Sequence, residues 1–365
     1  MIRALVLLLT LSSCFQEDRA KVVKIEDFSM ENIDWLPVEE DTIWIDLYNF
    51  KVIQSDSLHL IANPVSGWID KDYIYVVDDE MKSIYLYTLD GKFVRYIGGM
   101  NEGPLEFRRI VKIEKINDTT VAVLDAGKAQ MYILNIQNES ILYHHSFQII
   151  GAHDFCVLNN DIYVIGNFVK SDSGKVVRAY SVTGQYYKSF GEIPDYKRDI
   201  DRYHKQMLFY HITNGKIACL KNEDLIIVAY ENLPIIQAFS PNGKLVWEYR
   251  IPYFNKMVYI EFKNRGLFMS WEYDFDIMGS LNGIERGVIY QLFHHTIEEA
   301  GKRENIFVTT YYISTDGKGW VLSAPEGLSW NHEILAVNDS RVIATSDDPE
   351  PRIILAQVEW PDFLQ

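Results

Sequence analysis

Short runs of β-branched, aromatic and aliphatic residues, separated by polar gaps, recur along most of the chain. In four segments a strand-like run is followed by a polar gap, a second run, a tight turn and a third run. The equivalent positions Tyr87, Leu134, Tyr180 and Phe239 are separated by 47, 46 and 59 residues, and the stretch 191–211 reads as an insertion in the long interval. Such runs have the composition of half-buried strands, so the pattern predicts an antiparallel unit that repeats about every 46 residues.

The turns of these units support the same interpretation. Asp90-Gly91, Thr183-Gly184 and Asn242-Gly243 each place a glycine where a tight hairpin needs a positive φ. Short antiparallel strands at a period of 40–50 residues are typical of a β-propeller. No strand-like run alternates with a helix-length pattern, which argues against a parallel βαβ sheet.

The remaining sequence completes a six-bladed ring. A fifth unit fits runs at 319–323, 333–337 and 341–344. The sixth combines the chain ends, with 42–47 or 50–53 beside 352–356, because pairing the N- and C-terminal strands in one blade closes the ring.

We therefore expect an all-β chain with a six-bladed β-propeller over residues 41–365. Residues 252–303 are the least regular part and are expected to form a decorated blade or insertion, with a helical acidic tail around Gln291 to Ala300.

The first residues have the features of an export signal. A basic start, Met1-Ile2-Arg3, precedes an apolar stretch that is too short to span a bilayer. The following Leu11-Ser12-Ser13-Cys14 resembles the bacterial lipobox, in which the chain is cut before the cysteine and its sulfur is diacylated. The resemblance implies a signal peptide over 1–13, lipidation at Cys14 and an anchor or linker over 14–40. Two acyl chains give stable anchoring, so we expect membrane contact through the lipid anchor only.

A second resemblance lies in residues 85–107, Tyr-Leu-Tyr-Thr-Leu-Asp-Gly-Lys-Phe-Val-Arg-Tyr-Ile-Gly-Gly-Met-Asn-Glu-Gly-Pro-Leu-Glu-Phe. This segment resembles the NHL-like phrase of the six-bladed β-propeller lipoproteins of Bacteroidetes, over about residues 42–110, although Leu105 replaces a usual glycine. The family implies an outer-membrane lipoprotein on the periplasmic or cell-surface face. It carries no established catalytic residues. The acidic Phe15-Gln16-Glu17-Asp18 resembles the surface-export signal of such lipoproteins.

Composition narrows the choice of partners and of cysteine chemistry. The chain of 365 residues has 35 Lys and Arg against 51 Asp and Glu, a net charge of −16, which argues against nucleic-acid binding.

Cys156 and Cys219 lie in strand-like runs. An exported protein can form disulfides, but the usual behaviour of cysteine as a small apolar residue predicts two buried free thiols.

Asp78 and Asp125 are the candidate metal ligands, since they end equivalent strands and carboxylate oxygens suit Ca²⁺. The alternative, which we favour, is that each accepts hydrogen bonds from the turn that follows. The adjacent pairs His144-His145 and His294-His295 are not expected to chelate one metal, because neighbouring side chains in a strand point to opposite faces.

Four aromatic residues in the second half of the chain are candidate ligand contacts, because rigid aromatic surfaces bind sugars and peptides. They are Trp271, Tyr273, Trp320 and Trp330. Packing between blades is the alternative, and the more usual one.

The favoured function is a lipid-anchored binding or scaffold protein without a cofactor, which presents a propeller face to a glycan, peptide or protein. No catalytic motif is present, so a non-enzymatic role is favoured and activity stays open. The alternative is a Ca²⁺-dependent, lactonase-like hydrolase with carboxylates at the propeller axis, where the metal would polarise a carbonyl oxygen.

Overall fold

The computed structural model of the chain describes residues 21–24, 42–45, 47–53, 61–99, 103–137, 140–168, 174–192, 214–251, 254, 258–262, 266–269, 275–296, 305–323, 332–346 and 352–361. The regular elements of these residues are strands, apart from the 3₁₀ turn η1 (Gly103–Leu105). No helix in this part of the chain is long and apolar enough to cross a membrane.

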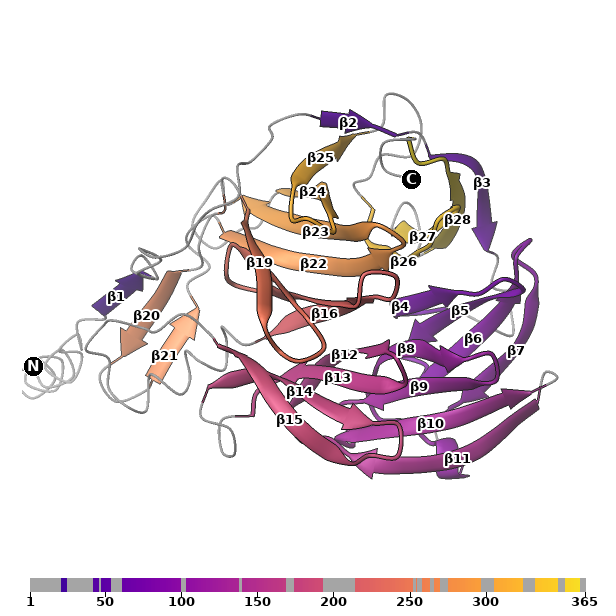
Figure 1. Cartoon of the computed structure of the whole chain (residues 1–365). Coiled ribbons are helices and arrows are strands. Elements are labelled where there is room, and N and C mark those ends of the chain that lie inside the picture. Colours follow the sequence, from indigo (N-terminus) through magenta and orange to yellow (C-terminus); the bar gives the residue numbers. More distant parts are fainter. Residues whose placement is uncertain are drawn as a thin grey trace, which may run out of the picture.

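Six antiparallel sheets form the blades of a ring (Figure 1). Blade 1 contains β4 (Pro64–Ile69), β5 (Tyr73–Asp78), β6 (Ser83–Thr88) and β7 (Phe93–Gly98). Blade 2 contains β8 (Ile110–Asn117), β9 (Thr120–Asp125), β10 (Gln130–Gln137) and β11 (Ser140–Gln148). Blade 3 contains β12 (Ala152–Leu158), β13 (Asp161–Gly166), β14 (Lys175–Ser181) and β15 (Tyr186–Glu192). Blade 4 contains β16 (Gly215–Leu220), β17 (Leu225–Tyr230), β18 (Ile235–Phe239) and β19 (Leu245–Arg250).

The last two blades use both ends of the chain. Blade 5 contains β22 (Phe275–Ile284), β23 (Gly287–Thr296), β24 (Asn305–Ser314) and β25 (Gly319–Ser323), and β2 (Thr42–Trp44) pairs with β25 in parallel. Blade 6 contains β26 (Ile334–Val337), β27 (Arg341–Ser346), β28 (Arg352–Val358) and β3 (Leu47–Ile53). The antiparallel pairing of β28 with β3 joins the C-terminal strand to an N-terminal one.

The first strand of each blade lies innermost. Around the axis these strands contact one another in the order β4, β8, β12, β16, β22, β26 and back to β4. The prediction of an all-β, six-bladed propeller closed by N- and C-terminal strands is therefore confirmed.

The apolar core is divided into six clusters, one between each pair of adjacent blades. The second strands are buried on both faces, and β17 is buried at all of its residues. A strand that packs against neighbours on both faces has a continuous apolar sequence rather than an alternating one. This explains why the second strands are the clearest runs in the sequence.

The turns between third and fourth strands follow one local rule in four blades. Gly91, Gly184, Gly243 and Gly317 have φ of 84–86°. Each glycine N–H donates to the carbonyl of a Ser or Thr three residues earlier, as Gly91 does to Thr88 at 2.9 Å. The predicted positive φ at the glycines of the first, third and fourth units is confirmed.

Two parts of the sequence-based division are wrong. The expected fifth unit mixes two blades, because Gly319–Ser323 is the outermost strand of blade 5 whereas Ile334–Val337 and Arg341–Ser346 are the first strands of blade 6. The expected helix at Gln291 to Ala300 is also wrong where the structure describes it, since β23 continues through Thr296.

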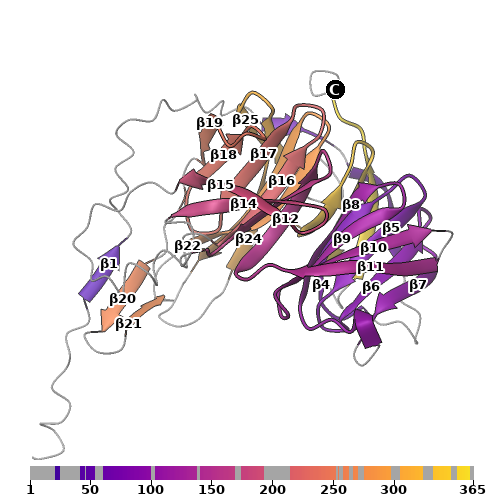
Figure 2. The ribbon, with the colours of Figure 1, turned by 60° about the horizontal axis from the view of Figure 1, so that its bottom comes forward.

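A small sheet of order β1-β20-β21 lies apart from the ring (Figures 1 and 2). It contains β1 (Lys21–Lys24), β20 (Val258–Phe262) and β21 (Gly266–Met269). β1 pairs antiparallel with β20, so a segment before the propeller is joined to the insertion that precedes blade 5.

Candidate functional site

A cavity of about 530 Å³ opens at the axis of the ring, at the end where first strands turn into second strands. Five of the six inner strands contribute to its wall. Small residues lie on four of these strands: Gly67, Ala218, Gly283 and Ala336. The long side chains of Lys112 and Glu114 come from the fifth, β8. The small residues leave room at the axis, and charged side chains reach the cavity from β8 and from the hairpins of blades 4, 5 and 6.

Side chains connect the inner strands of neighbouring blades near this axis. An inner strand pairs with only one strand of its own blade, so the N–H groups of its other edge need acceptors from elsewhere. The carboxylate of Asp154 accepts from the Ile217 N–H at 3.0 Å. Glu114 accepts from the Val157 N–H at 3.1 Å.

Gln291 makes the same connection between blades 5 and 6. Its amide oxygen accepts from the Ile334 N–H at 2.7 Å and its amide nitrogen donates to the His332 carbonyl at 2.8 Å. Gln291 is fully buried, so both the oxygen and the nitrogen of its side-chain amide need hydrogen-bond partners within the protein.

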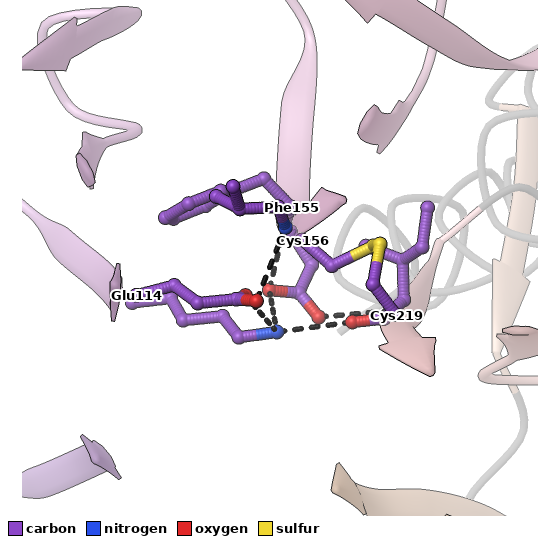
Figure 3. Close-up of a disulfide and its surroundings, with 8 residues drawn as sticks. Glu114, Phe155, Cys156 and Cys219 are labelled. Carbon is purple, nitrogen blue, oxygen red and sulfur yellow. Dashed lines mark hydrogen bonds and ion pairs between the residues drawn. A yellow bond between two sulfur atoms is a disulfide. The ribbon is translucent and has the colours of Figure 1, made fainter. Parts of the chain in front are cut away.

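Lys112 lies between two axial carboxylates. Its ammonium lies 3.4 Å from Asp154 and 3.8 Å from Glu114, and it donates to the Ile217 carbonyl at 3.0 Å. Figure 3 shows these interactions beside Glu114. Burial raises the pKa of Glu114 above its ordinary value, while the ammonium charges of Lys112 and Lys221 oppose the rise. These groups link the inner strands of blades 2, 3 and 4.

The hairpins around the cavity mouth are connected as well. Asn159 donates to Asp224 at 2.7 Å, and Asn222 donates to Glu285 at 2.9 Å. The N–H of Glu285 donates to Asp339 at 3.2 Å. Blades 3 to 6 are thus linked in sequence at this face, which fixes the shape of the mouth.

Within the described ranges, the cavity wall holds three lysines and three acidic residues: Lys112, Lys115, Lys221, Glu114, Glu285 and Asp339. Lys115 pairs with Asp70 at 3.3 Å. Lys221, by contrast, forms no ion pair within the described residues and is exposed to solvent. Its ammonium group is therefore able to contact a ligand.

An aromatic residue of β4 also lines the cavity. Trp68 is partly buried and stacks on Tyr75, with ring centres 4.7 Å apart, and the Lys115 ammonium lies 5.8 Å from its ring centre. Sequence reasoning did not select Trp68, because only the fold places the end of β4 at the axis.

Cys156 and Cys219 form a disulfide, with Cα atoms 5.5 Å apart (Figure 3). The prediction of two free thiols is therefore wrong. The two cysteines occupy the fifth positions of β12 and β16, the inner strands of consecutive blades. These strands lie side by side at the axis, where their equivalent positions meet, and Cys219 also lines the cavity.

The candidate metal ligands Asp78 and Asp125 are fully buried at the ends of second strands. Asp78 accepts backbone hydrogen bonds from Ala62, Asn63, Glu80 and Met81 at 2.6–3.2 Å. Asp125 accepts from Arg108, Arg109 and Lys128 at 2.9–3.1 Å. Each carboxylate thus joins the strand end to the preceding connection and to its own turn. Among the described residues, no group of three His, Cys, Asp or Glu side chains is arranged to hold a metal ion.

The remaining candidates lie in different places. Trp320 packs against the cluster between blades 5 and 6, with its ring stacked on Tyr312 at 5.7 Å. Cys14, Trp271, Tyr273 and Trp330 lie outside the described residues.

His294 is bonded at both ring nitrogens, which sequence reasoning did not foresee. Nδ1 lies 2.8 Å from the buried carboxylate of Asp276, and Nε2 lies 2.8 Å from the Thr309 hydroxyl. The three residues lie on the adjacent strands β22, β23 and β24. This arrangement gives the buried Asp276 a hydrogen-bond donor and connects three strands of blade 5.

Solved structures share the fold. A protein from Bacteroides fragilis that is presumed to be exported aligns with a TM-score of 0.58 at 10% identity, over 87% of this chain and 96% of that one. A member of the DUF4221 family from Bacteroides vulgatus aligns with a TM-score of 0.56 at 8% identity, over 86% and 97%. The WD40 repeats of RRP9 align with a TM-score of 0.51 at 8% identity, over 86% and 100%. No family model matches the sequence, and no curated protein matches it. At these identities the similarity shows the propeller fold alone.

Proposed function

We propose that this chain is a lipid-anchored binding protein of the cell envelope, which holds a small polar ligand in its axial cavity. The observation that carries the proposal is the cavity itself. Its volume of about 530 Å³ falls within the range of roughly 300–1,000 Å³ that small-molecule sites have. The hydrogen bonds between blades give it a preformed wall, which lowers the ordering cost of binding.

The wall favours a ligand with several polar groups. Amide side chains of Asn222, Asn282 and Asn338 lie around the mouth together with Glu285 and Asp339. Such side chains offer both donors and acceptors. A glycan or peptide fragment, which carries both kinds of group, fits this lining better than an apolar molecule does.

Three observations support export and anchoring. The residues before Cys14 resemble a lipobox. The Cys156–Cys219 disulfide is typical of an oxidising compartment. A structurally similar Bacteroides fragilis protein is presumed to be exported. The proposed location is therefore the outer membrane, with the propeller held on the periplasmic or cell-surface side.

The binding proposal is tested on residues 15–365 with a panel of monosaccharides, sugar acids, disaccharides and dipeptides. A ligand at 100 times its Kd adds about 2.7 kcal/mol to the free energy of unfolding. For a chain of this size, that raises Tm by about 3 °C. The rise should be lost in Lys221→Ala, which removes a cavity ammonium.

Lys71→Ala is the matched control. Lys71 lies in the hairpin of blade 1 at the same face, its side chain is 74% exposed, and it does not line the cavity. The binding proposal fails if no compound raises Tm, or if Lys71→Ala weakens binding as much as Lys221→Ala does.

Anchoring is tested in cells by replacing Cys14 with serine. The proposal predicts that the wild-type chain incorporates a labelled fatty acid and sediments with outer membranes, whereas Cys14→Ser does neither. If the wild-type chain incorporates no labelled fatty acid, the anchoring proposal is wrong, and the cavity proposal is unaffected.

A further inference from the structure

The charged side chains of the axial cavity fall into two groups. On the blade 2 side, each lysine has a carboxylate beside it. The Lys112 ammonium lies 3.8 Å from Glu114, and the Lys115 ammonium lies 3.3 Å from Asp70. A charge with such a partner gains less from a ligand than a charge without one. The second group lies in the hairpins of blades 4, 5 and 6, and its members, the mouth charges, are Lys221, Glu285 and Asp339.

Among the described residues, no opposite charge lies beside any of the mouth charges. Lys221, Glu285 and Asp339 form no ion pair in this part of the chain. The two acids accept from neutral donors, Glu285 from the Asn222 amide at 2.9 Å and Asp339 from the Glu285 N–H at 3.2 Å. These hydrogen bonds hold the carboxylates in place but do not offset their charge. One ammonium and two carboxylates of the mouth charges are therefore available to a ligand.

The mouth charges lie close together at one rim of the cavity. They follow the inner strands β16, β22 and β26, which lie side by side in this order around the axis. At Gly283 the first two strands are so close that an added Cβ would lie 3.2 Å from the Cys219 carbonyl oxygen. Lys221 and Glu285 are each two residues beyond this contact, and the hydrogen bond between Asn222 and Glu285 joins their hairpins. One small ligand can therefore reach both kinds of charge.

The charge of Lys221 acts on the cavity wall. Burial raises the pKa of Glu114, and the ammonium charges of Lys112 and Lys221 oppose the rise. Lys112 lies beside Glu114, whereas Lys221 acts on it from blade 4 without forming an ion pair. Although Lys221 is exposed to solvent, its ammonium is thus close enough to the cavity to attract an anionic group there.

We propose that the ligand of the axial cavity is a short peptide with a free amino group and a free carboxylate. The peptide carboxylate would pair with the Lys221 ammonium, and the peptide ammonium would pair with the carboxylates of Glu285 and Asp339. Charge-assisted hydrogen bonds of this kind are roughly twice as strong as neutral ones. The inference rests on the proposed cavity site and narrows the class of its ligand.

Other polar ligands pair fewer of these groups. A neutral glycan offers no charge to the mouth, and a sugar acid offers a carboxylate but leaves the two acids without a cation. The peptide groups between the two termini carry N–H donors and C=O acceptors. The amide side chains in the cavity wall can bind both kinds of group, and they belong to Asn222, Asn282 and Asn338.

Isothermal titration calorimetry on residues 15–365 tests the ligand class. The probes are dipeptides with small, apolar, acidic and basic side chains, each in three forms: free, acetylated at the amino group and amidated at the carboxyl. The inference predicts that at least one free dipeptide binds. Either modification removes one terminal charge and should raise the Kd of that dipeptide by about fivefold or more. Added salt should weaken the free form more than the modified forms.

Two variants assign each terminus to its partner. Lys221→Met removes the ammonium, so it should raise the Kd of the free dipeptide by about fivefold or more and leave that of the amidated form unchanged. The double variant Glu285→Gln/Asp339→Asn should weaken the free form and leave the acetylated form unchanged. Both new amides keep an oxygen that can accept the existing hydrogen bonds.

Lys71→Met and Asp72→Asn are the matched controls. Both residues lie in the hairpin of blade 1 at the same face, with side chains 74% and 62% exposed, and neither lines the cavity. Each control should leave the Kd of every form unchanged. Controls that weaken binding as much as the mouth variants do would overturn the inference.

The outcomes separate this inference from the cavity proposal. If no free dipeptide binds but a sugar or sugar acid raises Tm in a way that depends on Lys221, the cavity proposal stands and the peptide inference is wrong. If no compound binds at all, both are wrong. Modified dipeptides that bind as tightly as the free ones would also overturn the inference, as would a Lys221→Met variant that weakens the amidated form as much as the free one.

Discussion

The Cys156–Cys219 disulfide should make a large contribution to stability. The bond closes a loop with a sequence separation of 63 residues. In the chain-entropy description, a loop of this length contributes about 4 kcal/mol, because it restricts the unfolded chain. The entropy of unfolding of a chain this long is about 0.8 kcal/mol per kelvin. Removing the bond should therefore lower Tm by about 5 °C.

The assay is scanning calorimetry of residues 15–365 and of the double variant Cys156→Ala/Cys219→Ala. A reductant breaks the bond without changing the size of any side chain, so it separates the effect of the bond from the effect of the smaller alanine side chains. Dithiothreitol should lower the Tm of the wild-type chain by several degrees and leave the double variant unchanged. Two titratable thiols in the native, non-reduced protein, or a Tm that reductant does not change, would refute the reasoning.

Three further predictions follow from buried carboxylates. Asp125→Ala leaves three backbone N–H groups without their acceptor. The substitution should therefore lower the free energy of unfolding, measured by urea denaturation, by about 3 kcal/mol. A decrease of less than about 1 kcal/mol would contradict this role. Because Asp78 and Asp125 are occupied by backbone donors, EDTA should leave Tm unchanged, and a drop that Ca²⁺ reverses would show a metal site instead. Burial raises the pKa of Glu248 above 4.5, although a hydrogen bond from Gln237 opposes the rise. The folded chain then binds the proton of the Glu248 carboxyl more tightly than the unfolded chain does. The protonated carboxyl therefore contributes to the free energy of unfolding below pH 4.5, and this contribution is lost as pH rises through the raised pKa. In Glu248→Gln, the free energy of unfolding should therefore decrease less above pH 4.5 than it does in the wild-type chain. An identical pH dependence in the two proteins would argue against a raised pKa of Glu248.

The second, third and fourth strands of the first four blades could be predicted because their sequences are distinctive. The second strands are buried on both faces and are apolar throughout, and tight turns with glycine follow the third strands in blades 1, 3 and 4. The inner strands were not recognised as the first strands of blades, although the runs around Cys156 and Cys219 and the run at 333–337 were identified as strand-like. β8 carries Lys112, Glu114 and Lys115 and β4 carries Gly67, since part of each strand faces the axial cavity while Ile110, Ile113 and Ile69 pack in the core.

The fifth unit and the disulfide were missed for different reasons. β22, β23 and β24 are each ten residues long, so blade 5 departs from the period of the earlier units. Cys156 and Cys219 are far apart in sequence, and only the ring brings β12 beside β16. Their equivalent positions in consecutive units are the signal that could have identified the pair.

The central claim is that the axial cavity is the ligand site. Hydrogen–deuterium exchange tests it most directly, measured on residues 15–365 with and without the panel compound that raises Tm the most. The account predicts slower exchange in the hairpins of blades 4, 5 and 6 around Lys221, Glu285 and Asp339, which surround the cavity mouth. Slower exchange confined to outermost strands such as β11 or β19 would contradict it.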